Sequence, residues 1–177
     1  MVAADPETGQ SEMYEAILSQ LATARHRAWL TFGYFVPDPR TKEALISAAR
    51  RGVDVRLMLP GISDFWAPVA AGRSNYDDLL AAGVRIHEWR KAVMHAKTAV
   101  IDSSWSSIGS TNLDWRSFVH NWEADVVVRD PAFAREMERR FVLDEQQAVA
   151  IDKRKWDERG PLERIKEALA RAWEYML

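Results

Sequence analysis

The sequence over residues 28–89 indicates two strand–helix–strand units in succession. Buried strands are indicated by dense or alternating apolar patterns at three places: residues 28–36, 53–59 and 84–89. Helical patterns lie between them and each is followed by a glycine: residues 39–51 and 74–82. Successive units of this kind place parallel strands side by side with right-handed crossovers. We therefore predict an α/β fold with a mixed, largely parallel sheet flanked by helices on both faces.

The rest of the chain adds elements at both ends of this core. We predict a loose leader over residues 1–10, a helix from Ser11, an apolar loop over 60–72, a strand pair at 98–101 and 105–108, a strand at 123–128, and helices over 132–150 and 161–177. The last helix is amphipathic with a polar face of mixed charge, which favours packing over membrane binding. All 177 residues are predicted to form a single domain.

Charge and cysteine content limit the classes of function that fit this chain. The net charge is −2, which argues against a nucleic-acid partner because polyanion binding depends on clustered Lys and Arg. The sequence has no cysteine, so disulfides and thiolate metal sites are excluded. No apolar run approaches the roughly 18–20 residues that span a bilayer.

Residues 95–112 read HAKTAVIDSSWSSIGSTN and concentrate polar groups suited to chemistry on a phosphate. In an extended segment the side chains of His95 and Lys97 project to the same face. A neutral imidazole can attack phosphorus and form a covalent intermediate, while a lysine offsets the charge of the phosphate oxygens. The amide of Asn112 and the hydroxyl of Ser110 can donate hydrogen bonds to the same oxygens. We predict that no metal and no cofactor is required.

Glu123 begins the next predicted strand, and it is the candidate carboxylate for holding the second ring nitrogen of His95. Such a contact would fix the tautomer that attacks. An ordinary carboxylate at a strand end remains the alternative interpretation of Glu123. The other histidines, His26, His87 and His120, are predicted to be structural or exposed.

The spacing HxK, four residues, Asp and then GSxN resembles the HKD signature of the phospholipase D superfamily. Four further stretches resemble the C-terminal half of bacterial cardiolipin synthases: YFVPD (34–38), LPGISD (59–64), GRS (72–74) and STNLDWRS (110–117). The resemblance implies a phospholipase D-like domain with one HKD repeat. It also implies phosphatidyl transfer of the cardiolipin synthase type, in two steps through a phosphohistidine intermediate.

The resemblance also assigns roles by position. It makes His95 the nucleophile or the general acid, Lys97 and Asn112 the phosphate ligands, and Ser110 an assisting group, with Glu123 orienting His95. Asp102 completes the family's catalytic motif, although its position in a tight turn indicates that its carboxylate holds the turn instead of taking part in the reaction.

Family members carry two such motifs, and this sequence contains one. The resemblance therefore implies a homodimer in which each copy supplies one histidine, or a half that needs a partner half. It implies a phospholipid substrate, with phosphatidylglycerol favoured, and a peripheral place on the cytoplasmic face of the membrane. Phe65 and Trp66 are predicted to contact acyl chains or another subunit. Two other functions stay open, a homodimeric phosphodiesterase or nuclease and a catalytically silent lipid-binding partner subunit.

Overall fold

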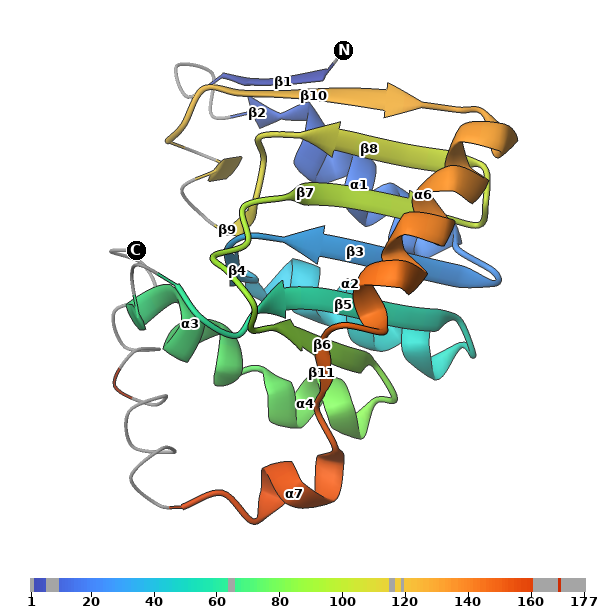
Figure 1. Cartoon of the computed structure of the whole chain (residues 1–177). Helices are drawn as coiled ribbons and strands as arrows, with labels where there is room; N and C mark the ends of the chain where they lie inside the picture. The colour runs from blue at the N-terminus through green and yellow to red at the C-terminus, as the bar shows by residue number, and fades with distance from the viewer. Residues whose placement is uncertain are drawn as a thin grey trace.

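The computed structural model describes residues 2–5, 10–63, 66–114, 117–118, 120–160 and 169. Among these residues, one sheet of nine strands is formed in the order β11-β6-β5-β3-β7-β8-β10-β1-β2 (Figure 1). Its strands are β1 (Val2–Asp5), β2 (Gln10–Ser11), β3 (Arg27–Phe32), β5 (Asp54–Pro60), β6 (Arg85–Trp89), β7 (Lys97–Ile101), β8 (Trp105–Gly109), β10 (Glu123–Val128) and β11 (Val149–Ala150). A separate parallel pair joins β4 (Phe35–Val36) to β9 (Leu113–Asp114).

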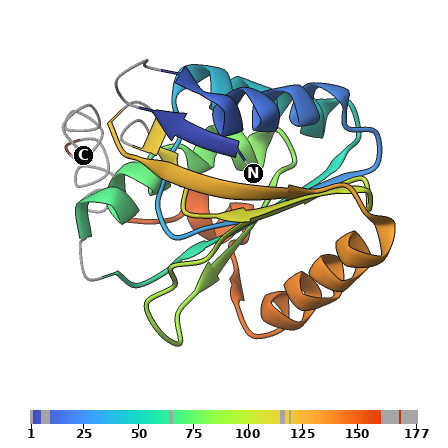
Figure 2. The ribbon, with the colours of Figure 1, turned by 90° about the horizontal axis from the view of Figure 1, so that it is seen from above.

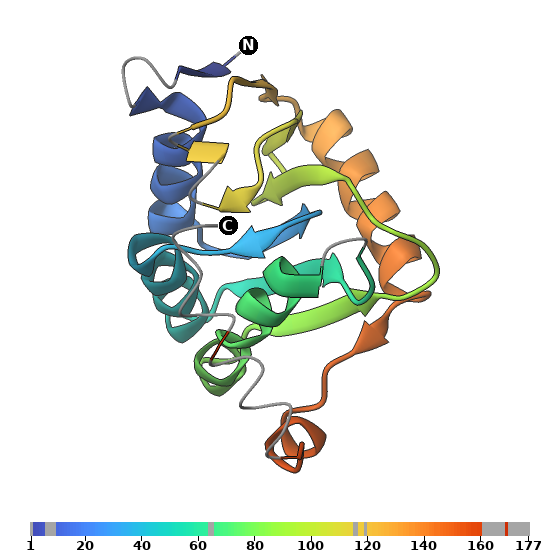
Figure 3. The same cartoon turned by 90° about the vertical axis from the view of Figure 1, so that its left-hand side faces the viewer.

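Helices cover both faces of the sheet, as predicted (Figures 2 and 3). The helices are α1 (Glu12–Thr23), α2 (Pro39–Arg50), α3 (Trp66–Arg73), α4 (Tyr76–Ala81), α6 (Pro131–Glu145) and α7 (Lys153–Asp157). One face carries α1, α2 and α4, and the opposite face carries α6, whereas α3 lies at the edge where β3 and β5 end. In the described part of the chain, no helix has the length and apolar character needed to cross a membrane.

The alternation of side chains along the strands divides the core into two clusters. In β3, Ala28 and Leu30 face α1, α2 and α4, and they belong to the larger cluster. Trp29 faces the other way and packs with Phe141 of α6, with ring centroids 5.4 Å apart. The strands in the middle of the sheet are buried on both faces, which explains why their sequences are apolar almost throughout.

Within the nine-stranded sheet, parallel pairing is confined to β3–β5 and β5–β6, and the other described neighbours are antiparallel. The mixed sheet is confirmed, but the predicted predominance of parallel pairs is wrong. After β6 the chain stays at the same edge of the sheet through residues 90–96, without a crossover helix, so β7 must run back antiparallel to β3. The tight turn at residues 102–104 then folds β8 onto β7.

The loose leader predicted over residues 1–10 contains a strand instead, because Val2–Asp5 pairs with β10. The backbone N–H and C=O groups of β10 would otherwise be exposed at the edge of the sheet, and β1 satisfies them.

Three other boundaries differ from the prediction. The expected loop over 60–72 contains most of α3, and the strand over 28–36 is interrupted at Gly33 and Tyr34. The helix over 132–150 ends at Glu145, after which β11 pairs with β6. The predicted helix over 161–177 lies outside the described residues, apart from Leu169.

Candidate active site

The polar residues at the two ends of the 95–112 stretch, His95 and Lys97 at one end and Ser110 and Asn112 at the other, lie at the edge of the sheet where β3, β5 and β6 end. Because β7 is antiparallel to β3 and to β8, β7 begins at this edge and β8 ends there. β10 is antiparallel to β8 and so begins at the same edge. We call it the active-site edge, and it lies on the left in Figure 1.

Lys97 is the first residue of β7 and pairs with Phe32 of β3. Its side chain is 6% exposed, and Nζ donates a hydrogen bond to the backbone carbonyl of His95 at 2.7 Å. Burial lowers the pKa of Lys97, and the negative charges of Glu123 and Asp114 partly offset this effect. The ammonium group is therefore held in one place by the backbone beside the exposed histidine.

His95 lies two residues before β7, which begins at Lys97, one residue earlier than predicted. Its side chain is exposed, and its ring stands edge-on to Tyr34 with centroids 6.0 Å apart. Gly33 allows this segment to approach the end of β3, since a methyl group there would lie 3.0 Å from the Cα of His95 and 3.2 Å from Nζ of Lys97. Among the described residues no hydrogen bond occupies either ring nitrogen of this exposed side chain.

Asn112 joins this group from the segment between β8 and β9. Its side chain is 7% exposed, and its Oδ1 accepts a hydrogen bond of 3.0 Å from the backbone N–H of Tyr34. The neighbouring pairing of Phe35 with Leu113 supports the same contact. Because the amide oxygen is engaged, the Asn112 NH₂ is the end of the amide that remains as a donor.

Ser110 is exposed at the end of β8, and its hydroxyl is engaged with the backbone of β10. The Oγ accepts from the Ala124 N–H at 3.0 Å, and a long contact of 3.5 Å joins it to the Ala124 carbonyl. The structure therefore places Ser110 at the active-site edge but gives it a structural contact with β10.

Glu123 begins β10, as predicted, and its charge acts on Lys97. Its Oε1 accepts a hydrogen bond of 3.2 Å from Asn121. No hydrogen bond joins Glu123 to His95 within the described residues, so the orienting role assigned to Glu123 stays a prediction. In the same part of the chain, no group of three or more acidic or histidine side chains is arranged to hold a metal ion.

Asp102 lies at the far end of β7, five residues or about 17 Å along the strand from Lys97. Its carboxylate accepts hydrogen bonds from the backbone N–H groups of Arg25, His26 and Arg27 at 2.8, 2.8 and 3.0 Å. Burial acts to raise the pKa of Asp102, but these three donors outweigh it and hold the pKa below its usual range. The contacts agree with the prediction that Asp102 holds the turn.

A buried pair beside the site was not anticipated from the sequence. The Thr111 hydroxyl donates a hydrogen bond to the carboxylate of Asp125, which is 3% exposed. That carboxylate occupies the space above Gly109, where a Cβ atom would collide with it. Asp125 thereby holds Thr111, the residue before Asn112. The sequence gives no local signal of this role, because Asp125 is an aspartate inside a strand of six residues.

Replacing Asp125 with asparagine should stabilise the domain by about 1 kcal/mol at pH 8, because a buried charge is removed while an oxygen remains to accept from Thr111. Burial raises the pKa of Asp125, and the charge of Glu123 adds to this, whereas hydrogen bonds from Thr111 oppose it. The folded state therefore favours the protonated acid, and stability decreases as the pH rises from about 4. Urea unfolding at pH 4, 6 and 8 should show a smaller decrease in D125N, and parallel curves for the two proteins would contradict this.

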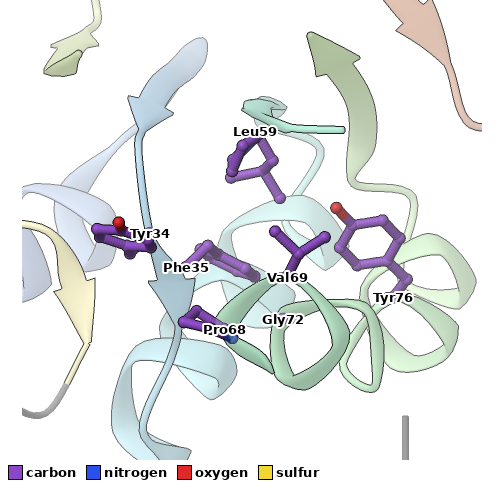
Figure 4. A pocket seen from close by; sticks show the side chains of 8 residues that line it. Tyr34, Phe35, Leu59, Pro68, Val69, Gly72 and Tyr76 are labelled. Atoms are coloured by element: carbon purple, nitrogen blue, oxygen red, sulfur yellow. The ribbon is translucent and has the colours of Figure 1, made fainter. Parts of the chain in front are cut away.

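A small apolar pocket, partly open to solvent, adjoins His95 through Tyr34 (Figure 4). It is lined by the segment that follows β3, by the end of β5, and by α3 and α4: Tyr34, Phe35, Leu59, Pro60, Pro68, Val69, Gly72 and Tyr76. Gly72 lets α3 pack closely here, because a Cβ atom would collide with the Phe35 carbonyl. The part of a substrate that lies next to a phosphate bound at His95 would therefore contact a largely apolar surface.

The HxK pair at this edge, with Asn112 beside it, defines the site as one of the phospholipase D class. The chain belongs to the family described as "Cardiolipin synthase, PLD-like domain", which matches residues 17–144. The family expected from the motif spacing is thereby confirmed.

Individual relatives agree with this assignment. The chain is 33% identical over 177 residues to the probable cardiolipin synthase YwiE of Bacillus subtilis (strain 168), covering 100% of this chain and 35% of the relative. It is 33% identical over 171 residues to a cardiolipin synthase of Clostridium perfringens (strain SM101 / Type A), covering 97% and 36%. The chain thus spans about a third of the length of the curated relatives it matches.

Solved structures share the fold at low sequence identity. The phospholipase D family member Nuc from Salmonella typhimurium superposes with a TM-score of 0.71 at 20% identity, covering 84% of this chain and 95% of that one. The phosphatidylserine synthase of Haemophilus influenzae Rd KW20 gives 0.71 at 13% identity, covering 94% and 43%. The same fold therefore occurs both as a chain of about this size and as part of a longer one.

Proposed function

We propose that this domain supplies one of the two histidine motifs of a phosphatidyltransferase that forms cardiolipin from phosphatidylglycerol. The observation that carries the proposal is the active-site edge, where an exposed His95 stands beside the buried cation of Lys97 and the amide of Asn112. Relatives named cardiolipin synthases support it, with 33% identity over the whole chain. The apolar pocket beside Tyr34 supports a lipid substrate over a polar polymer.

In the first step, a ring nitrogen of His95 attacks the phosphorus of one phosphatidylglycerol. A P–N bond forms, the bond from phosphorus to the headgroup glycerol oxygen breaks, and that oxygen takes a proton from the second histidine. In the second step, a glycerol hydroxyl of another phosphatidylglycerol attacks the phosphorus, the P–N bond breaks, and the hydroxyl proton passes to the second histidine. Two lipids thus give one cardiolipin and one glycerol.

Lys97 and Asn112 would stabilise the charge that builds on the phosphate oxygens, since one is a fixed cation and the other a neutral donor. Glu123 would act mainly through Lys97, by offsetting the loss of solvation of its ammonium group. If Glu123 also orients His95, the contact forms when the second motif or the lipid is bound. Ser110 would assist by tying the segment before Asn112 to β10.

The second histidine would come from another copy of the chain or from a partner half, because one His95 cannot serve at once as nucleophile and as acid. A bilayer holds the proposed substrate, so the domain would work as a peripheral protein on the cytoplasmic face of the membrane.

The purified chain, first sized in solution, should be assayed on phosphatidylglycerol and separately on single-stranded DNA. We expect a twofold assembly to form cardiolipin and glycerol in equal amounts. Cleavage of DNA without a lipid product would contradict the proposal and support a nuclease. A monomer that binds lipid but is inert on both substrates, even with a second motif-bearing half added, would support a silent partner subunit.

A further inference from the structure

Four of the large exposed apolar side chains in the described part of the chain lie at the active-site edge. Trp122 is 68% exposed, Trp66 66%, Val93 55% and Ile62 43%, and we call these four residues the apolar rim. Moving such side chains out of water into an apolar environment is favourable in free energy. Four of them around one site are therefore unlike the scattered surface apolar residues that need no explanation.

The rim residues come from four separate places in the chain that the sheet brings to one edge. Ile62 follows the end of β5, and Trp66 opens α3. Val93 lies between β6 and β7, two residues before His95, and Trp122 directly precedes β10. From β5 to β10 is four strand spacings, or about 19 Å, so the rim extends across the whole site (Figures 1 and 3).

We propose that the apolar rim is a docking surface for a phospholipid bilayer, which brings His95 to the layer of headgroup phosphates. Tryptophan suits this place, since its ring has an apolar body and a polar N–H and is enriched where membrane meets water. This surface deepens the proposed function and rests on it, because the substrate phosphate would lie within that layer.

Charge beside the rim favours an anionic bilayer. Lys91, two residues before Val93, is exposed, and its Nζ donates to the neutral amide oxygen of Gln147 at 2.9 Å, so its charge is not neutralised there. Arg90 is half-exposed and forms an ion pair with Glu88. The carboxylate of Glu88 is fully buried and also forms a bidentate ion pair with Arg73. Phosphatidylglycerol is anionic and attracts such basic groups near the membrane surface.

The docking test measures sedimentation of the full chain with vesicles of phosphatidylglycerol and phosphatidylcholine. W66S and W122S should each weaken vesicle binding by about tenfold or more, the effect expected from losing one large buried apolar side chain. V93S and I62S should weaken it less. L143S is the matched control, since Leu143 is 40% exposed on α6 and is not one of the four rim residues, and it should change binding less than twofold.

Transfer on detergent-dispersed phosphatidylglycerol separates this proposal from the proposed function. The rim variants should keep that activity while losing transfer on vesicles. If the tryptophan variants bind vesicles like the unchanged chain, or no more weakly than L143S, the membrane surface is wrong although the transferase assignment stands. If they instead reduce the particle mass and leave vesicle binding intact, the rim is an interface between copies and the proposal is equally overturned.

Discussion

Replacing His95 with alanine should reduce phosphatidyl transfer by about 10³-fold or more, because the proposed reaction then has no nitrogen with which to form the P–N bond. The loss should appear in kcat and in kcat/KM together, since binding of the lipid does not require the imidazole. Cardiolipin and glycerol released from phosphatidylglycerol, followed at matched protein concentration, measure it.

The same substitution should leave the free energy of unfolding within about 0.5 kcal/mol, because His95 is exposed and its side chain makes no hydrogen bond in the described part of the chain. H26A is the matched control, since His26 is also exposed but lies at the opposite edge of the sheet. Retained transfer in H95A, or an equal loss in H26A, would show that the site has been assigned to the wrong histidine.

Replacing Asp102 with alanine should give the opposite result, a large loss of stability with little direct effect on the chemistry. Three backbone N–H groups lose their acceptor, and residue 102 has a φ of 50°, which alanine adopts less readily than aspartate. We expect the free energy of unfolding to fall by about 2–4 kcal/mol. D102N keeps an acceptor oxygen and tolerance of this φ, so it should lose about half as much.

The effect of Asp102 should also depend on pH. Because the pKa of Asp102 is lowered by folding, its contribution is fully present above about pH 4 and is lost as the pH falls through the folded pKa. Urea unfolding at pH 7 and pH 3 should show a smaller difference in the free energy of unfolding between D102A and the unchanged chain at pH 3. A purely structural role would be contradicted if this difference were equal at both pH values. It would also be contradicted if D102A were fully folded and yet had lost transfer activity.

These two residues illustrate how far a motif can be interpreted without coordinates. His95 and Asp102 belong to the same short pattern, and the spacing identifies both, but their surroundings separate them. The tight Asp-Ser-Ser turn was visible in the sequence, which made the structural role of Asp102 predictable. The three N–H groups that it binds belong to residues 25–27, about 75 positions away, and no local pattern identifies them.

Boundaries failed where long-range contacts override local preference. A loose leader is predicted over residues 1–10, yet residues 2–5 form a strand because β10 offers an unpaired backbone. The prediction of a largely parallel sheet extended the pattern of two strand–helix–strand units to the whole chain. The antiparallel strands arise from a connection and a hairpin that carry no helix.

The sequence by itself determined the family of this protein and its candidate reactive groups, because those groups are set by residue type and the HxK spacing places His95 and Lys97 within two residues of each other. It also determined the mixed α/β class, through the periodicity of its apolar residues. Only the tertiary structure decided that Lys97 is buried while His95 is exposed, that Asp125 supports the segment before Asn112, and that four apolar side chains surround the site. Those features depend on strand register and on the packing of distant segments, which the order of residues does not express locally.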